Sequence, residues 1–286
     1  MKVLSALKYA KEVLSEIENE EYAKWEALLI LSHLLNVPPL NVYLYLDKEI
    51  PQKSFLKILE ERKKKKPLPY ILKTTYFWGR KFYIEEGVLI PRQDTEILIS
   101  AFLELPLEKG KVLELGVGAG IISITLLLER KELKVFAVDI EPKALKITKK
   151  NAKTYEVEKR LFLIKGDWFS PFLEKPLFNA IVSNPPYISF EEWETLGEEV
   201  RLYEPKSALV SGKEGTEFQE KLLKFADKYL LKGGFLIFEI GYNQGKRIRE
   251  LLDLYKWNYK IYRDLKNYER VVVAWKENTL LKVESL

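Results

Sequence analysis

The sequence contains no cysteine and only one histidine in 286 residues. Without cysteine there can be no disulfide bond and no thiol catalysis, and a single histidine leaves no ligand set for a soft metal ion. That histidine, His33, stands among leucines, so we expect a core or boundary residue. No run of about 18 apolar residues occurs, which argues against a membrane span. The first residues lack the apolar segment and cleavage site of a secretory signal, so we expect a cytoplasmic protein.

Strong charge of one sign is also missing, since the formal net charge is only +5. A mild excess of this kind does not indicate a nucleic-acid groove. The basic run at residues 62–66 is typical of a solvated helix end, or of a contact with an RNA-rich partner. Apolar residues form 47% of the chain and charged residues 31%, a globular balance. The length allows one large domain or two unequal ones.

Three segments of the chain differ in pattern. Residues 1–66 place apolar residues at helical spacing, with a helix at 25–35 that is apolar nearly all round, and predict a small helical domain. Residues 67–90 are crowded with aromatic residues and predict a β-hairpin linker, acting as an aromatic interdomain core or as a wall of a substrate cleft. Residues 91–286 have the pattern of a larger α/β domain, in which Pro91 is expected to begin a helix.

The α/β domain alternates apolar strands with helices. Five strands are expected before the final pair, at residues 111–115, 133–138, 161–164, 179–183 and 234–240. This alternation predicts a parallel sheet covered by helices on both faces. The final pair, 257–262 and 270–275, leaves no room for a crossover helix, so the last strand should be antiparallel to its neighbour. Ligands of such sheets bind outside the carboxyl ends of the strands.

One strand end carries the sequence Asn-Pro-Pro-Tyr at residues 184–187. Pro185 and Pro186 have no backbone N–H and fix their own φ, so they stop the strand in a rigid turn. Outward carbonyls, the amide of Asn184 and the flat ring of Tyr187 are suited to hold a planar carboxamide or an exocyclic amine. A plain proline turn after a strand is the alternative interpretation.

The preceding strand ends carry polar and glycine motifs. The first strand runs into a loop with three alternate glycines, which permits close backbone approach to a ligand and precedes a helix N-terminus. Asp139 ends the next strand about 20 residues further on, where an acid can take both hydroxyls of a ribose. Asp167 and Trp168 follow the third strand and suit the edge and face of an adenine. The candidate residues at the first strand end are Glu114 in the strand and, in the loop, Gly116, Val117, Gly118, Ala119 and Gly120.

This order of motifs resembles the class I S-adenosylmethionine-dependent methyltransferases that methylate planar nitrogens. A finer match lies at residues 89–96, Leu-Ile-Pro-Arg-Gln-Asp-Thr-Glu, which is similar to the signature of the peptide chain release factor glutamine N5-methyltransferases. Residues 203–205 and 238–241, with Asp264 and Arg270, fit the same family. The resemblance covers roughly residues 67 to 275. Two departures from the family pattern are Gln93, in place of a second proline, and Lys73, where the family often has glycine.

The resemblance implies a seven-stranded methyltransferase sheet, S-adenosylmethionine as cofactor with S-adenosylhomocysteine as product, and a release factor as protein substrate. The helical domain would then help to dock that substrate. The glycine loop would hold the methionine end of the cofactor, Asp139 its ribose, and Asp167 with Trp168 its adenine. Asn184 would also contact the cofactor. Arg92 and Glu204 could line the substrate cleft or form an ordinary salt bridge. Glu114 could contact the cofactor ammonium or only stabilise the loop, and Asp139 could instead cap the next helix.

The Asn-Pro-Pro-Tyr turn indicates how transfer would work. The Asn184 side-chain oxygen and the Pro185 carbonyl can accept the two N–H bonds of an amide, and Tyr187 can stack on it. Two other functions stay open: adenine-N6 or guanine-N2 methylation of DNA or RNA with a flipped base, and a non-catalytic protein that kept the fold. The match at residues 89–96 favours the glutamine methyltransferase, with no membrane role and without nucleic acid as substrate.

Overall fold

The computed structural model describes residues 1–276. Residues 277–286, the end of the predicted 91–286 domain, lie outside the described part. Contacts between residues divide the chain into two compact units. The N-terminal unit comprises Met1–Thr74 and Gly197–Tyr203, and the C-terminal unit comprises Thr75–Leu196 and the chain from Glu204 onward. The division therefore falls eight residues beyond the predicted boundary at residue 66, and the first unit also takes a short segment from the middle of the larger domain.

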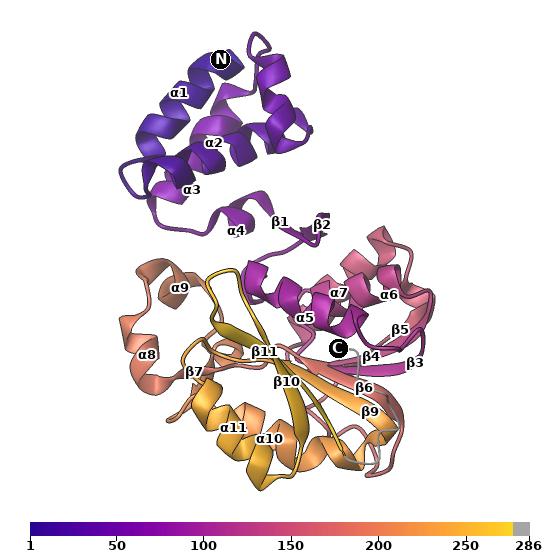
Figure 1. The fold of residues 1–286 in the computed structure, drawn as a ribbon. Helices are drawn as coiled ribbons and strands as arrows, with labels where there is room; N and C mark the ends of the chain where they lie inside the picture. Colours follow the sequence, from indigo (N-terminus) through magenta and orange to yellow (C-terminus); the bar gives the residue numbers. More distant parts are fainter. Residues whose placement is uncertain (277–286) are drawn as a thin grey trace. The chain divides into compact units, whose positions relative to one another are not determined.

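The N-terminal unit is helical, as expected (Figure 1). Its apolar residues form one core that includes Ala10, Ile30, Leu31 and Phe55. His33 is exposed in the last turn of α2, so the expectation of a core or boundary residue is wrong. The elements are α1 (Val3–Leu14), α2 (Glu20–Leu35), η1 (Pro39–Tyr45), α3 (Gln52–Lys63), α4 (Leu68–Leu72) and α9 (Glu198–Tyr203).

The basic run at 62–66 is not uniformly solvated. Arg62 is only 1% exposed and its guanidinium lies 2.9 Å from a Glu26 carboxylate oxygen and 3.1 Å from one of Glu199. Glu199 lies in α9, so this buried ion pair network fixes the returning segment to α2 and α3 within the same unit. Burial raises the pKa of Glu26 to about 7. The expectation of a solvated helix end holds for Lys63 and Lys64, which are exposed, and is wrong for Arg62.

The backbone conformation of Lys73 explains why the family that the sequence resembles often has glycine at this position. It ends α4 with φ +53, in the left-handed region. That conformation costs a residue with a Cβ roughly 1–2 kcal/mol relative to its usual backbone, and glycine avoids the cost. Among residues 1–276 no single helix is long and apolar enough to span a membrane, although α2 and η1, bent by 71°, meet the length and composition criteria together.

The C-terminal unit is built on a seven-stranded sheet with the order β10-β11-β9-β6-β3-β4-β5. β3 pairs in parallel with β4 and β6, and β6 pairs in parallel with β9. β11 is antiparallel to both β9 and β10, which confirms the predicted direction of the last strand. The strands are β3 (Lys109–Leu115), β4 (Glu132–Asp139), β5 (Leu161–Lys165), β6 (Phe178–Ser183), β9 (Leu230–Glu239), β10 (Asn258–Arg263) and β11 (Glu269–Trp275).

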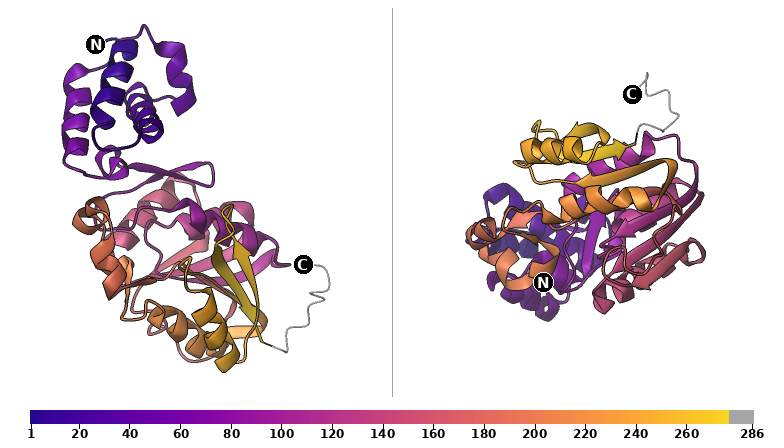
Figure 2. Two further views of the ribbon diagram at one scale, coloured as in Figure 1. Left: turned by 60° about the vertical axis from the view of Figure 1, so that its left-hand side comes forward. Right: turned by 90° about the horizontal axis from the view of Figure 1, so that it is seen from below.

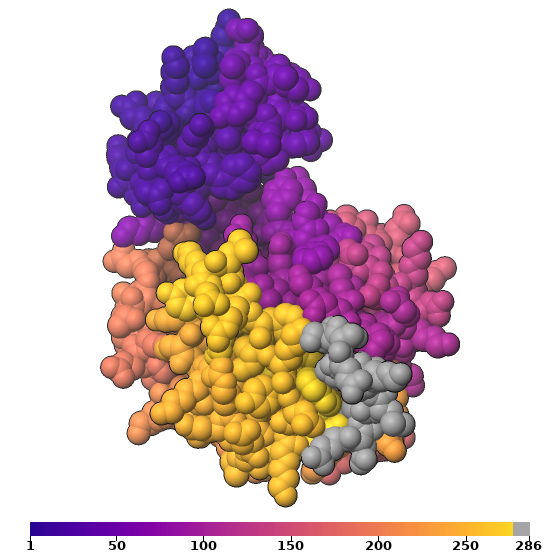
Figure 3. Space-filling view, viewed as in Figure 1, coloured from indigo at the N-terminus to yellow at the C-terminus, as the bar shows by residue number. Residues whose placement is uncertain are grey.

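Helices cover both faces of this sheet, as Figures 1 and 2 show. The core on one face contains apolar residues of α5 (Glu96–Leu103), α6 (Ile121–Glu129) and α7 (Pro142–Thr154). The core on the other face contains residues of α10 (Glu217–Phe225) and α11 (Gly245–Leu254). In Figure 3 the yellow residues of the β10–β11 hairpin and the magenta residues around α5 lie side by side, and α5 contacts both strands.

Smaller elements surround the sheet. The predicted hairpin is present as β1 (Thr74–Phe77) and β2 (Arg80–Tyr83). Pro91 does not begin a helix: the chain stays extended there, forms a 3-10 turn, η2 (Gln93–Thr95), and enters α5 at Glu96. The remaining elements are η3 (Glu158–Arg160), β7 (Ile188–Ser189), α8 (Phe190–Thr195), η4 (Lys206–Ala208), β8 (Val210–Gly212) and η5 (Ala226–Lys228).

Candidate functional site

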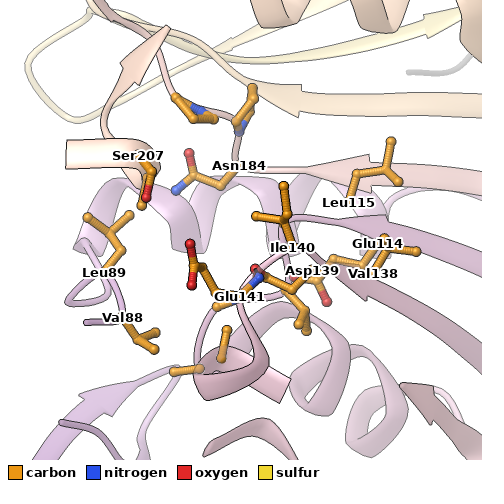
Figure 4. Close-up of a pocket in the computed structure, with 18 of the residues that line it drawn as sticks. Val88, Leu89, Glu114, Leu115, Val138, Asp139, Ile140, Glu141, Asn184 and Ser207 are labelled. Atoms are coloured by element: carbon orange, nitrogen blue, oxygen red, sulfur yellow. Dashed lines mark hydrogen bonds between the residues drawn. The ribbon is translucent and has the colours of Figure 1, made fainter. Parts of the chain in front are cut away.

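A cavity of about 290 Å³ lies at the carboxyl ends of β3, β4, β5 and β6. Residues from all four predicted motifs line it, and Figure 4 shows Asn184, Asp139 and Glu141 around the same space. The parallel pairing of the strands brings their ends to one edge, although the motifs are far apart in sequence. The predicted residues that line it are Glu114, Gly116, Val117, Gly118, Ala119, Asp139, Asp167, Trp168, Asn184, Pro185 and Pro186.

The glycine loop turns the chain from β3 into α6. Gly116 and Gly120 have φ of +77 and +80, which side chains rarely adopt. A Cβ on Gly120 would lie 2.6 Å from the Thr148 methyl carbon, whereas a Cβ on Gly116 would meet no atom within 4 Å. Gly120 therefore serves helix packing against α7. Gly116 borders the cavity with open space beside it.

Glu114, the last but one residue of β3, is a buried acid with one partnered oxygen. Its Oε2 accepts hydrogen bonds from the backbone N–H of Ser123, at 3.0 Å, and from the Ser123 hydroxyl. Its Oε1 is buried and has no hydrogen-bond partner in residues 1–276. Burial raises the pKa of Glu114 to about 8. A cation such as an amino acid ammonium would satisfy this oxygen and favour the charged form.

Asp139, at the end of β4, holds the glycine loop in place. One carboxylate oxygen accepts from the Gly118 N–H at 2.9 Å, and the other accepts from the Glu141 N–H at 2.9 Å. Burial raises the pKa of Asp139. Each oxygen keeps a second acceptor site, so the carboxylate can still take ribose hydroxyls. Glu141 also lines the cavity. Its signal in the sequence is a second acid two residues after the acid at the strand end.

Asp167 and Trp168 follow β5 at the cavity's edge. Trp168 has φ +53 and stacks on Phe218 with ring centroids 4.8 Å apart and planes inclined by 5°. Asp167 is exposed, and its carboxylate lies 3.9 Å from the Lys221 ammonium. Phe218 lines the cavity, although its position on a helix far along the chain left no sequence signal. The aromatic pair is suited to cover a flat base.

The Asn184 side chain is held by Thr95, which is held in turn by Glu239. Both residues lie in segments that fit the family, but neither was predicted from the sequence to have a role in the site. The Asn184 NH2 donates to the Thr95 hydroxyl oxygen at 3.0 Å, and the Thr95 hydroxyl donates to a Glu239 carboxylate oxygen at 2.7 Å. The Tyr187 hydroxyl donates to the other Glu239 oxygen at 3.1 Å. Glu239 is fully buried, and burial raises its pKa to about 7. Burial, with Glu239 nearby, also raises the pKa of Tyr187.

Tyr187 itself is placed differently from the other residues of its motif. Asn184, Pro185 and Pro186 line the cavity, but Tyr187 is not among the lining residues. Its hydroxyl is held by Glu239, and its backbone carbonyl accepts from the Gln244 side chain at 2.8 Å. The tyrosine therefore anchors the turn beside the cavity, and stacking on a substrate amide remains a prediction.

Arg92 and Glu204 form a pair with each other. Their guanidinium and carboxylate lie 2.6 Å apart, and the second Glu204 oxygen accepts from the Ile90 N–H at 3.1 Å. Neither residue lines the cavity. They instead fix the segment before η2, whose residues Leu89 and Pro91 do line it.

The sheet order, the glycine loop and the acids at successive strand ends define a class I methyltransferase, and the residues present fit S-adenosylmethionine. The Methyltransferase small domain family matches residues 92–201, and the PrmC N-terminal domain family matches residues 5–72. A methyltransferase from Pyrococcus furiosus has a TM-score of 0.53 at 18% identity, over 79% of this chain and 97% of that one. That likeness shows the fold alone.

Relatives at higher identity specify the family. The release factor glutamine methyltransferase of Aquifex aeolicus is 43% identical over 269 residues, which cover 92% of this chain and 94% of that protein. The one of Bacillus cereus is 37% identical over 261 residues, which cover 88% and 90%. The chain belongs to the release factor glutamine methyltransferase family.

Proposed function

We propose that the protein transfers a methyl group from S-adenosylmethionine to the side-chain amide nitrogen of a glutamine in a peptide chain release factor. The observation that carries the proposal is the state of Asn184. Its NH2 is held by Thr95, while its Oδ1 accepts no hydrogen bond within residues 1–276 although the residue lines the cavity. An oxygen at the cavity with no hydrogen-bond donor is suited to accept from an N–H of an incoming amide.

The cofactor supplies a methyl group that is already electrophilic on its sulfonium. Glu114 would hold its ammonium through the unpartnered oxygen, Asp139 its ribose, and Trp168 with Asp167 its adenine. Gly116 and its neighbours leave room for the methionine end. These contacts would hold the reactive methyl at the edge of the sheet, and such positioning would supply much of the rate enhancement.

The amide nitrogen is a weak nucleophile, because its lone pair is delocalised into the carbonyl. Asn184 Oδ1 and the Pro185 carbonyl would accept its two N–H bonds, fix its orientation and favour the positive charge that develops on it. The S–CH3 bond breaks as the N–CH3 bond forms, and the nitrogen then loses one proton. No base is needed before transfer, since the nitrogen becomes acidic only as it is alkylated.

The release factor is proposed as substrate because the curated relatives carry that name. The N-terminal unit, predicted to dock the protein substrate, and the cytoplasmic location expected from the missing signal both remain predictions. The test is incubation with labelled S-adenosylmethionine and separate pools of release factors, rRNA and DNA. Label on release factor, at a glutamine side chain, is expected. Label on either nucleic acid would move the function to base methylation.

A further inference from the structure

Two hydrogen bonds connect Asn184 to Glu239: Asn184 donates to Thr95, and Thr95 donates to Glu239. Glu239 lies at the end of β9, Thr95 in the turn η2 and Asn184 after β6, so three separate elements meet at this point. We propose that Glu239 is a positioning residue whose acceptor-only carboxylate forces the Asn184 side chain to keep its oxygen for the substrate amide. The inference rests on the proposed function and deepens it.

The direction follows from counting protons. An ionised carboxylate has no proton to donate, so the Thr95 hydroxyl must donate across the 2.7 Å contact to Glu239. The hydroxyl has one proton, so its oxygen can only accept across the 3.0 Å contact with Asn184. The group that Asn184 presents to Thr95 is therefore its NH2, and Oδ1 is left for the substrate.

Asn184 alone could not specify this orientation. An amide rotated by 180° about its last bond has nearly the same shape, with oxygen and nitrogen exchanged. In the rotated form its NH2 would meet the N–H bonds of the substrate glutamine, and no hydrogen bond could form between two donors. The turn of Pro185 and Pro186 fixes the backbone and does not distinguish these two states.

Glu239 is itself fixed by a second arm. Its other oxygen accepts from the Tyr187 hydroxyl at 3.1 Å, so both oxygens have a partner and the carboxylate cannot easily turn. The same acid thereby connects Asn184 and Tyr187, the first and last residues of the turn. This gives the tyrosine a role through Glu239 even though it does not line the cavity.

The chain of hydrogen bonds depends on the charge of Glu239. Burial raises its pKa to about 7; Asp94 of η2 raises it as well, while Arg270 of β11 and the hydroxyls of Thr95 and Tyr187 lower it. Above that pH the carboxylate is ionised and only accepts. As the pH falls through about 7 it takes up a proton, becomes a donor at one oxygen, and no longer enforces the orientation. Methyl transfer should therefore decline on the acid side.

The test compares Glu239→Gln with wild type in single-turnover methyl transfer at saturating cofactor across pH. Glutamine has the same shape but can present either its oxygen or its NH2 to Thr95, so the orientation is no longer enforced. We expect a loss of up to about 10²-fold, the size found when a preorganised polar group is removed from a site of developing charge. Cofactor Kd and substrate KM should change little, and the acid limb near pH 7 should disappear. Glu220→Gln, which alters another acid that accepts from a tyrosine hydroxyl, is the matched control at wild-type rate.

Thr95 variants keep the test decisive if Glu239→Gln fails to fold. Thr95→Ser retains the hydroxyl relay and should keep most activity, whereas Thr95→Val should lose as much as Glu239→Gln. A wild-type rate and pH profile for Glu239→Gln, or equal rates for Thr95→Ser and Thr95→Val, would overturn the inference. If wild type labels a nucleobase in place of release factor, the proposed function fails while the ratio of variant to wild type, measured on that base, still decides the role of Glu239.

Discussion

Changing Gly116 or Gly120 of the same loop to alanine should have different effects on stability and on cofactor binding. Gly116 and Gly120 have nearly equal φ, +77 and +80, so both variants carry the same left-handed strain of about 1–2 kcal/mol. Only Gly120→Ala adds a clash, because its Cβ would lie 2.6 Å from Thr148. Overpacking of that kind costs a further ~1–3 kcal/mol, and each kcal/mol lowers Tm by about 2–4 °C in a domain of this size.

Gly120→Ala should be the less stable variant, whereas Gly116→Ala should be the weaker binder of the cofactor. The methyl of Gly116→Ala enters open space beside the cavity, so this variant should weaken S-adenosylmethionine binding more than Gly120→Ala does. Gly120→Ala should lower Tm more than Gly116→Ala does. Thermal unfolding without ligand and calorimetric titration with cofactor measure the two effects separately. Equal Tm values for the two variants would refute the assignment of Gly120 to helix packing.

Three further outcomes are expected. Asp139→Ala should weaken cofactor binding by about 1.5–3 kcal/mol, the value of a hydrogen bond to a charged group, and unchanged calorimetric affinity in the folded variant would remove Asp139 from the site. Because burial raises the pKa of Glu114 to about 8, the ligand-free folded state binds the Glu114 proton more tightly than the unfolded chain and loses stability as pH rises from about 4.5 to 8. Glu114→Gln should remove this loss of stability and also lower the affinity for the cofactor. A Glu114→Gln curve of stability against pH that runs parallel to that of wild type would contradict the raised pKa. Lys73→Gly should raise the unfolding free energy by about 1 kcal/mol by relieving the left-handed strain, which denaturant unfolding would show, with no gain at the exposed Lys63→Gly as the control.

Sequence reasoning was most successful where one chemical feature marks one strand end. The glycine loop, Asp139, Trp168 and Asn184 each follow an apolar strand, and parallel pairing alone brings them together. The alternation of strands and helices predicted the parallel sheet, the short connection between the final strands predicted the direction of the last one, and the seven-stranded methyltransferase order came from the family resemblance. The site roles of these residues remain predictions, since geometry shows only their placement.

The missed features depend on contacts across the chain. Glu239 is a single acid in an apolar strand, and Thr95 looks like an ordinary residue before a helix. The pairing of β9 with β6 brings Glu239 close to Asn184, and η2 places Thr95 between them. Arg62 looked solvated because it begins a run of lysines, yet it is buried and pairs with acids of α2 and α9. An acid within an otherwise apolar strand was the signal available for Glu239.

The central claim is that Asn184 orients a glutamine nitrogen for methyl transfer. Single-turnover transfer to release factor at saturating cofactor, comparing wild type with Asn184→Ala, tests it most directly. The account predicts a decrease of about 10²–10³-fold with cofactor affinity and substrate KM little changed, and greater activity in Asn184→Asp than in Asn184→Ala because an acceptor remains. Transfer by Asn184→Ala at the wild-type rate would contradict the account and leave the turn a purely structural feature.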